Sequence, residues 1–169
     1  ANNVVADQYT IPVQLDYSLI KKALITQLYK GAGNTAELWK DKHGCSYLKL
    51  SNPEVSGQNG LIRLLNNIQA RFGTSIGRQC VTLIEWVGLL ETLQQPTINE
   101  AQSILSIPIT TVTATDPDGR SVSNNKIQDL IKRFAEPKLS AVKIDLTESR
   151  PDIEKSVSEF LPKENAAEI

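Results

Sequence analysis

One amphipathic stretch near the N-terminus, followed by almost continuous β-type sequence, most constrains how this chain can fold. Residues 15–28 carry apolar side chains at helical spacing, with charged and polar residues between them. Asp16 or Ser18 can cap the start of this helix, and Gly31 and Gly33 mark its end. A long antiparallel sheet with one apolar face needs a cover, and we expect this helix to provide it. The apolar positions of the predicted helix are Leu19, Ile20, Ala23, Leu24 and Leu28.

The first predicted strand runs directly into this helix. Residues 9–15 alternate between apolar and polar side chains, as a half-buried strand does. The alternation resumes at residues 47–50, after a connection at residues 33–44 that contains Trp39. Residues 1–8 are polar, and we expect them to be loose.

Residues 61–72 fit a helical stripe and a strand face equally well. The preceding Asn59-Gly60 pair is a strong hairpin signal, because both residues tolerate a positive φ. With Gly73 directly after the segment, this context favours a strand.

Two further β segments follow. Residues 80–93 are rich in Val, Thr, Ile and Trp, and alternation assigns one face to Thr82, Ile84 and Trp86. Residues 104–115 are strongly β in composition, and Pro108 within them indicates an edge or a bulge.

The character of the chain changes after a turn at residues 116–119. Asn124 can cap a helix that Pro137 is expected to end, and residues 138–146 alternate as a strand. Ser149 can cap a last helix, and residues 162–169 are expected to be loose. The pattern predicts an α+β fold: a strongly twisted antiparallel meander wrapped around the N-terminal helix, with a further helix near the C-terminus.

Length and charge narrow the class of protein. The 169 residues suit one domain, at residues 1–169, or one module of a larger protein. Lys and Arg total 18 against 19 Asp and Glu, which argues against a nucleic-acid partner because such binding requires a basic surface. No apolar run approaches the length of a transmembrane segment, about 18 residues.

Cys45 and Cys80 favour an exported protein. They precede or begin predicted strands 35 residues apart, where a disulfide would staple one end of the sheet, although two buried thiols remain the alternative. The N-terminal Ala1 suits a chain from which a leader has been removed. Glycosylation acceptors of the Asn-x-Ser/Thr type are absent from the sequence, which favours a bacterial periplasm. We therefore predict a disulfide and a periplasmic or otherwise exported location.

Two enzyme-like motifs have simpler explanations. Residues 73–77 fit the G-x-S-x-G nucleophile elbow around Ser75, but that chemistry needs a histidine later in the chain, and the only histidine is His43. Residues 31–36 fit G-x-G-x-x-A, but they follow a predicted helix and not a strand, so we interpret them as a helix end.

No metal or cofactor is expected either. His43, Cys45 and Cys80 lack the tight paired spacing of zinc ligands. The acidic residues form no close pair for acid–base catalysis. We therefore expect a protein that is not an enzyme and that uses no cofactor.

The apolar faces remain as the candidate site. The predicted interior is mainly Leu, Ile and Val, which suits an acyl chain, although the same pattern fits a filled core. Ala23 is the informative position, because a small residue on the buried stripe lets the sheet approach or leaves room for a ligand. The residues predicted to line a ligand are Leu19, Ala23, Leu24, Leu64, Ile68, Ile84 and Trp86.

The order of elements resembles bacterial exported members of the tubular lipid-binding (TULIP) superfamily. The resemblance covers residues 9–146 and rests on I-P-V-Q-L-D-Y-S-L-I-K-K-A-L, Trp39, L-S-N-P-E-V-S-G-Q-N-G, I-R-L-L-N-N-I-Q-A-R-F-G and Q-P-T-I. It implies a twisted sheet wrapped around a helix, with lipid in the groove between them. The function predicted is a non-enzymatic module that binds a lipid or another apolar ligand. The alternative is a structural or protein-interaction domain of the cell envelope with a filled core.

Overall fold

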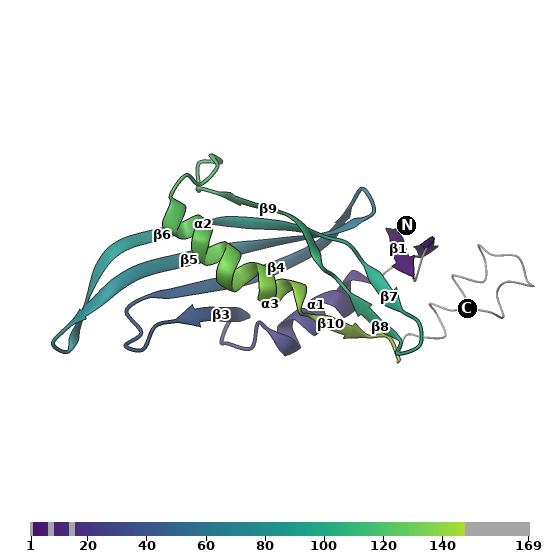
Figure 1. Cartoon of the computed structure of the whole chain (residues 1–169), viewed down its shortest axis with the longest axis horizontal. Helices are drawn as coiled ribbons and strands as arrows, with labels where there is room; N and C mark the ends of the chain where they lie inside the picture. The colour runs from purple at the N-terminus through teal and green to yellow at the C-terminus, as the bar shows by residue number, and fades with distance from the viewer. Residues whose placement is uncertain (1, 7–8, 14–15, 148–169) are drawn as a thin grey trace, which may run out of the picture.

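The computed structural model describes residues 2–6, 9–13 and 16–147, and these form two five-stranded sheets and a few helices (Figure 1). The predicted α+β class and the mostly antiparallel pairing are confirmed. In the larger sheet the order is β3 (Thr35–Lys40), β4 (Tyr47–Gln58), β5 (Leu61–Ile76), β6 (Gln79–Gln94) and β9 (Ile109–Thr115). In the smaller sheet it is β10 (Lys143–Asp145), β8 (Ile104–Ser106), β7 (Thr97–Asn99), β1 (Asn2–Ala6) and β2 (Tyr9–Val13). Only β1 and β7 pair in parallel among these strands.

The predicted N-terminal helix is α1 (Tyr17–Gln27). Asp16 caps it, because its side chain accepts the backbone N–H of Ser18 at 2.9 Å. Ile20 and Leu24 are its buried residues, and the helix contacts β4 and β10. Ile20 and Leu24 lie one turn apart and therefore on one face of the helix. This buried face attaches α1 to both sheets.

A second, longer helix lies across the larger sheet in Figure 1. It consists of α2 (Asn125–Leu130), the π-helical turn η1 (Ile131–Ala135) and α3 (Glu136–Ser140), which follow one another without a break. Asn124 caps it as predicted, because its Oδ1 accepts the backbone N–H groups of Lys126 and Ile127. This helix contacts β3 through η1 and β9 through α3, so the C-terminal helix covers part of the sheet face that we had assigned to the N-terminal helix.

The helix continues through Pro137, where we expected it to end. Proline lacks the backbone N–H and its ring collides with the carbonyl four residues earlier in a regular α-helix. Here Pro137 lies in the first turn of α3, directly after η1, where the N–H of Glu136 bonds to the carbonyl of Ile131, five residues earlier. The wider turn therefore accommodates the proline, and of the strand predicted at residues 138–146 only Lys143–Asp145 is formed.

The hairpin predicted before β5 and the strand predicted at residues 61–72 are both confirmed. Asn59 and Gly60 take positive φ values of 51° and 79° between β4 and β5. The ambiguous residues 61–72 belong to β5. The turn at residues 116–119 is also present, and the backbone N–H of Gly119 donates to the carbonyl of Asp116.

Three strand predictions need correction. The connection that contains Trp39 includes a strand, β3, whose Trp39 ring stacks on Phe134 at 5.1 Å. Residues 104–115 are two strands in different sheets, β8 and β9, because the chain crosses between the sheets at Ile107 and Pro108. The sequence did not predict β1, and the helix predicted after Ser149 lies outside the described residues.

One apolar core is shared by both sheets and the helices. Leu24 of α1, Leu48 of β4 and Leu90 of β6 are each 0% exposed, and Leu105 of β8 and Ile127 of α2 join the same cluster. Among the helices that the structure describes, none has the length and apolar character needed to cross a membrane.

Candidate functional site

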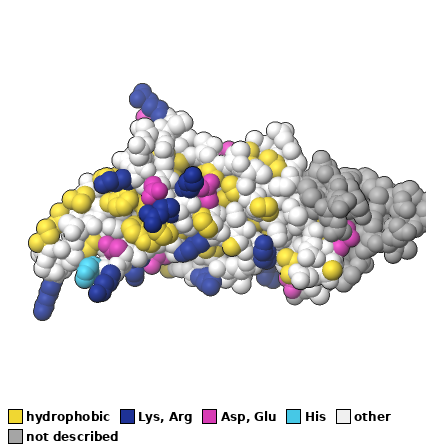
Figure 2. Space-filling view, in the orientation of Figure 1, with side chains coloured by type: hydrophobic (Ala, Val, Ile, Leu, Met, Phe, Trp, Pro, Cys, Tyr) yellow, Lys and Arg dark blue, Asp and Glu magenta, His cyan; other side chains and the backbone are white. Residues whose placement is uncertain are grey.

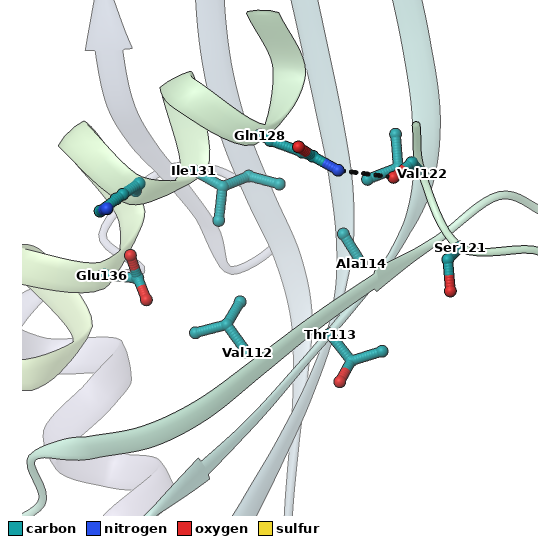
Figure 3. A pocket seen from close by; sticks show the side chains of 9 residues that line it. Val112, Thr113, Ala114, Ser121, Val122, Gln128, Ile131 and Glu136 are labelled. Carbon is teal, nitrogen blue, oxygen red and sulfur yellow. Dashed lines mark hydrogen bonds between the residues drawn. The ribbon is translucent and has the colours of Figure 1, made fainter. Parts of the chain in front are cut away.

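The clearest candidate site is a groove between strand β9 and the C-terminal helix, which we call the β9–helix groove (Figure 3). Its cavity volume is about 320 Å³. The groove is lined by Val112, Thr113, Ala114, Ser121, Val122, Gln128, Ile131, Lys132 and Glu136.

Part of the lining of this groove is apolar. Val112 and Ala114 alternate along β9 and point toward the helix in Figure 3, and Ile131 points from the helix toward the strand. The facing residues across the sheet, Thr92 and Leu90 of β6, are buried. The groove therefore lies over the apolar face of the sheet at its β9 edge.

The π-helical turn helps to shape the helical wall. In a π-helical turn, the hydrogen bond joins residues five apart, and their side chains lie close to one face of the helix. In an α-helix, residues five apart point in more different directions. Ile131 and Glu136 are five residues apart, and the N–H of Glu136 bonds to the carbonyl of Ile131. Both side chains consequently line the groove, with an apolar group and a carboxylate beside each other (Figure 3).

Polar groups mark the rim of the groove. The Gln128 Nε2 donates to the backbone carbonyl of Val122 at 2.8 Å, which ties α2 to the segment after β9. Lys132 and Glu136 add one charge of each sign, and Lys132 is exposed. An apolar cleft with a few polar groups at its edge is the usual form of a small-molecule site.

The turn beside the groove is anchored to the sheet. Trp86 of β6 donates its indole N–H to the Oδ1 of Asp116 at 2.6 Å. The backbone N–H of Asp116 bonds to the carbonyl of Arg120, and Thr115 bridges to Ser121. These contacts fix the turn that leads from β9 to the segment carrying Val122.

The seven residues predicted to line a ligand lie in or against the apolar core. Three of them, Leu24, Leu64 and Ile68, are 0–2% exposed and belong to the core cluster. The other four are partly buried and pack against that cluster: Leu19, Ala23, Ile84 and Trp86. The β9–helix groove is lined by other residues, so contact of these seven with a ligand stays a prediction.

Sequence reasoning missed the groove because its two walls are brought together only by tertiary packing. The alternation of Val112 and Ala114 and the helical spacing of Ile127 and Ile131 were visible in the sequence. The predicted helix already contained Gln128, Ile131 and Glu136, but no local pattern places that helix beside β9.

The predicted disulfide between Cys45 and Cys80 is present. It joins the loop at residues 41–46 to the start of β6. In the same loop the Ser46 Oγ accepts the backbone N–H of Gly73 at 2.9 Å and donates to its carbonyl at 3.1 Å. Hydrogen bonding from the backbone N–H of Ser46 lowers the pKa of Asp41 below its ordinary value.

Ser75 of the rejected G-x-S-x-G motif lies on the β5–β6 hairpin and His43 lies in the neighbouring loop, whereas residues 31–36 connect α1 to β3. Ser75 is within β5, where its hydroxyl donates to the carbonyl of Gly77. His43 is exposed in the loop at residues 41–46. Across residues 2–6, 9–13 and 16–147, no three His, Cys, Asp or Glu side chains gather in a way that could hold a metal ion.

Comparison with known proteins gives no relative. No protein-family model matches the chain, and neither a curated protein nor a solved structure matches it.

Proposed function

We propose that this protein is a non-enzymatic, exported binding module for a lipid or another small apolar ligand. The observation that carries the proposal is the β9–helix groove, where Val112, Ala114 and Ile131 contribute apolar walls. Lys132 also lines the groove and is exposed. Such a site suits an amphiphile whose apolar part contacts the walls and whose polar head meets the charged rim.

The size of the groove favours a small ligand. Small-molecule sites typically measure about 300–1,000 Å³, and the groove, at about 320 Å³, is near the lower end. We therefore infer that it accepts one short acyl chain or a ring and not a bulky lipid with several chains.

Two further observations support the proposal. A helix lying on the face of an antiparallel sheet agrees with the arrangement expected for the tubular lipid-binding superfamily, in which lipid lies between helix and sheet. The disulfide suits an oxidising compartment, in agreement with an exported protein. We extend the proposal to membership of that superfamily and to a sheet that wraps its helices.

The main rival is an envelope scaffold or protein-interaction domain without a ligand. The burial of Leu24, Leu64 and Ile68 favours it, because a filled core leaves no room between α1 and the sheet. Native mass spectrometry of freshly purified protein separates the two functions. A co-purifying apolar molecule supports the binding module, whereas repeatedly bare protein supports the scaffold.

Substitutions in the groove test the site itself. Ala114→Trp fills the groove and should weaken the uptake of a fluorescent fatty acid by about tenfold or more. The matched control is Thr111→Trp, because Thr111 is exposed on the opposite face of β9 and does not line the groove. Thermal unfolding of both variants checks that each is folded.

A charge change provides a second measurement that does not depend on filling the groove. Lys132→Glu should weaken uptake of the fatty acid, because it reverses the charge at the rim. Uptake of a neutral fluorescent alcohol of the same chain length should change little. Equal uptake of the fatty acid by the parent protein, Ala114→Trp and Lys132→Glu would remove the groove as the binding site.

A further inference from the structure

The end of the β5–β6 hairpin, residues 76–83, is exposed and apolar; we call it the hairpin tip. Every residue from Ile76 to Leu83 is exposed. The side chains of Ile76, Val81 and Leu83 are 63%, 41% and 66% exposed, which is unusual for large apolar residues. The tip forms the left end of the molecule in Figure 1, and Figure 2 shows hydrophobic side chains along that end.

Both faces of the hairpin tip are open. The register across the hairpin pairs Thr74 with Val81 and Ser75 with Cys80, so Val81 and Cys80 lie on opposite faces. Both are exposed, and so is Thr82. A protein partner normally covers one face of a sheet, whereas the interfacial layer of a membrane surrounds an inserted hairpin on every side.

The base of the hairpin is held in place. The disulfide joins Cys80 to Cys45, and the Ser46 Oγ bonds to both the N–H and the carbonyl of Gly73. A Cβ at Gly73 would lie 2.5 Å from the carbonyl oxygen of Cys45, so the loop passes directly against the strand. The tip is therefore presented in one arrangement, which lowers the entropy lost on binding.

The same end of the sheet carries positive charge. The register aligns Lys40, Tyr47, Arg71 and Glu85 across four strands. This row, together with the residues between it and the hairpin tip, comprises residues 40–47 and 71–85. These residues contain four cations and two carboxylates, a net charge of +2, whereas the net charge of the whole chain is −1. The cations are Lys40, Lys42, Arg71 and Arg78.

Behind the tip, two cations lie over the ring of Tyr47, which is itself only 8% exposed. The guanidinium of Arg71 lies over the Tyr47 ring at 5.1 Å, and Lys49 lies over the same ring at 4.3 Å. Arg71 also pairs with Glu85 at 3.0 Å. These contacts hold two basic side chains at the end of the sheet behind the tip, where they can meet anionic headgroups.

We propose that the hairpin tip docks this protein onto an anionic lipid bilayer surface. Ile76, Val81 and Leu83 enter the boundary between headgroups and acyl chains, a depth of about 5–10 Å. Arg78, at the turn itself, pairs with lipid phosphates and keeps the insertion shallow. This inference goes beyond the proposed function, since docking requires no ligand in the β9–helix groove.

Vesicle flotation of the disulfide-bonded protein tests the proposal. The protein should float with vesicles of phosphatidylcholine containing about a third phosphatidylglycerol, bind weakly to phosphatidylcholine alone, and dissociate at high salt. Ile76→Ser with Leu83→Ser should lower the partition coefficient by about tenfold or more, because buried methylene groups drive insertion. Arg78→Gln should lower it by about fivefold.

The control pair lies further along β6, away from the tip. Val87 and Leu89 are 51% and 39% exposed, and Val87→Ser with Leu89→Ser removes two large exposed apolar side chains outside the tip. Flotation should be unchanged in this control. An equal loss in both double variants would overturn the tip as the docking element.

Two other outcomes would also overturn the proposal. In the first, the parent protein does not float, and sedimentation shows a concentration-dependent dimer that the Ile76→Ser/Leu83→Ser variant abolishes. This result would mean that the tip binds a second copy of the chain. No flotation and no self-association would leave the tip without a lipid role. Ala114→Trp should not affect flotation, so failure of the groove and failure of the tip can be distinguished.

Discussion

The hydroxyl of Tyr29 donates a hydrogen bond to the Oδ1 of Asn66, joining the segment after α1 to the middle of β5. Both residues are 1% exposed. Burial raises the pKa of Tyr29 far above its ordinary value, so the hydroxyl is protonated and donates at neutral pH. This polar pair lies against the apolar core and ties the segment after α1 to β5.

Tyr29→Phe removes the donor and leaves a buried acceptor without this partner. We expect the free energy of unfolding to fall by about 1–3 kcal/mol, measured by urea denaturation. Replacing both residues, as Tyr29→Phe with Asn66→Leu, should cost less than the sum of the two single changes. Additive costs would contradict an energetic coupling between the two side chains.

The disulfide should contribute strongly to stability. Closing a loop across the 35 residues that separate Cys45 from Cys80 is worth about 3–4 kcal/mol in the chain-entropy account. Cys45→Ala with Cys80→Ala should therefore lower the denaturation midpoint, and intact mass with alkylation should find no free thiol in the parent protein. Reduction should destabilise the parent protein and leave the double variant unchanged.

Local patterns in the sequence predicted local features well. The Asn59-Gly60 turn, the Asp16 and Asn124 caps and the strand character of residues 61–72 depend on neighbours in the chain, and each is present. The disulfide was predicted from the position of its cysteines relative to strand starts, which is also a local signal.

The features that the sequence did not predict depend on packing between distant segments. Trp39 looked like a loop residue, but it packs against Phe134 and Phe72, which no local pattern reveals. Pro137 breaks a regular α-helix, and only the preceding π-turn allows the helix to continue. The helical wall of the β9–helix groove precedes Pro137, so the groove was missed because no local pattern places that helix beside β9.

The lowered pKa of Asp41 predicts that the stability of the protein falls at acidic pH. Its pKa in the folded protein is lowered, chiefly by the backbone N–H of Ser46, so its charged form stabilises the loop at residues 41–46. That stabilisation is present above the unfolded pKa, about 3.9, and is lost as pH falls through the lower folded pKa. Asp41→Asn should be less stable than the parent protein at neutral pH, and the two stabilities should converge in acid.

An NMR titration of the Asp41 carboxyl provides the direct measurement. The midpoint should lie below that of an aspartate in a model peptide. A midpoint at or above the model value, or parallel stability curves for the parent protein and Asp41→Asn down to acid pH, would show that the loop does not depend on this charge.

Gly88 of β6 leaves space for the Trp86 indole and for the end of β9, which both lie directly against it. A Cβ at this position would collide with the carbonyl of Thr115 and lie 2.5 Å from the Cζ2 of Trp86. Gly88→Ala should therefore cost about 1–3 kcal/mol in thermal unfolding. It should also shift the indole N–H resonance of Trp86, whose hydrogen bond to Asp116 would be displaced. Val87→Ala, at the exposed neighbouring position, should leave both measurements nearly unchanged.

Ala23 distinguishes a filled space beneath α1 from an open one. It is partly buried and packs against the core that contains Leu24. Ala23→Leu should overpack this region and lower the free energy of unfolding by about 1–3 kcal/mol in urea. Since Ala23 does not line the β9–helix groove, fatty-acid uptake by the folded variant should equal that of the parent protein. Unchanged stability together with weaker uptake would instead move the ligand to the space between α1 and the sheet, where the seven residues predicted from the sequence lie.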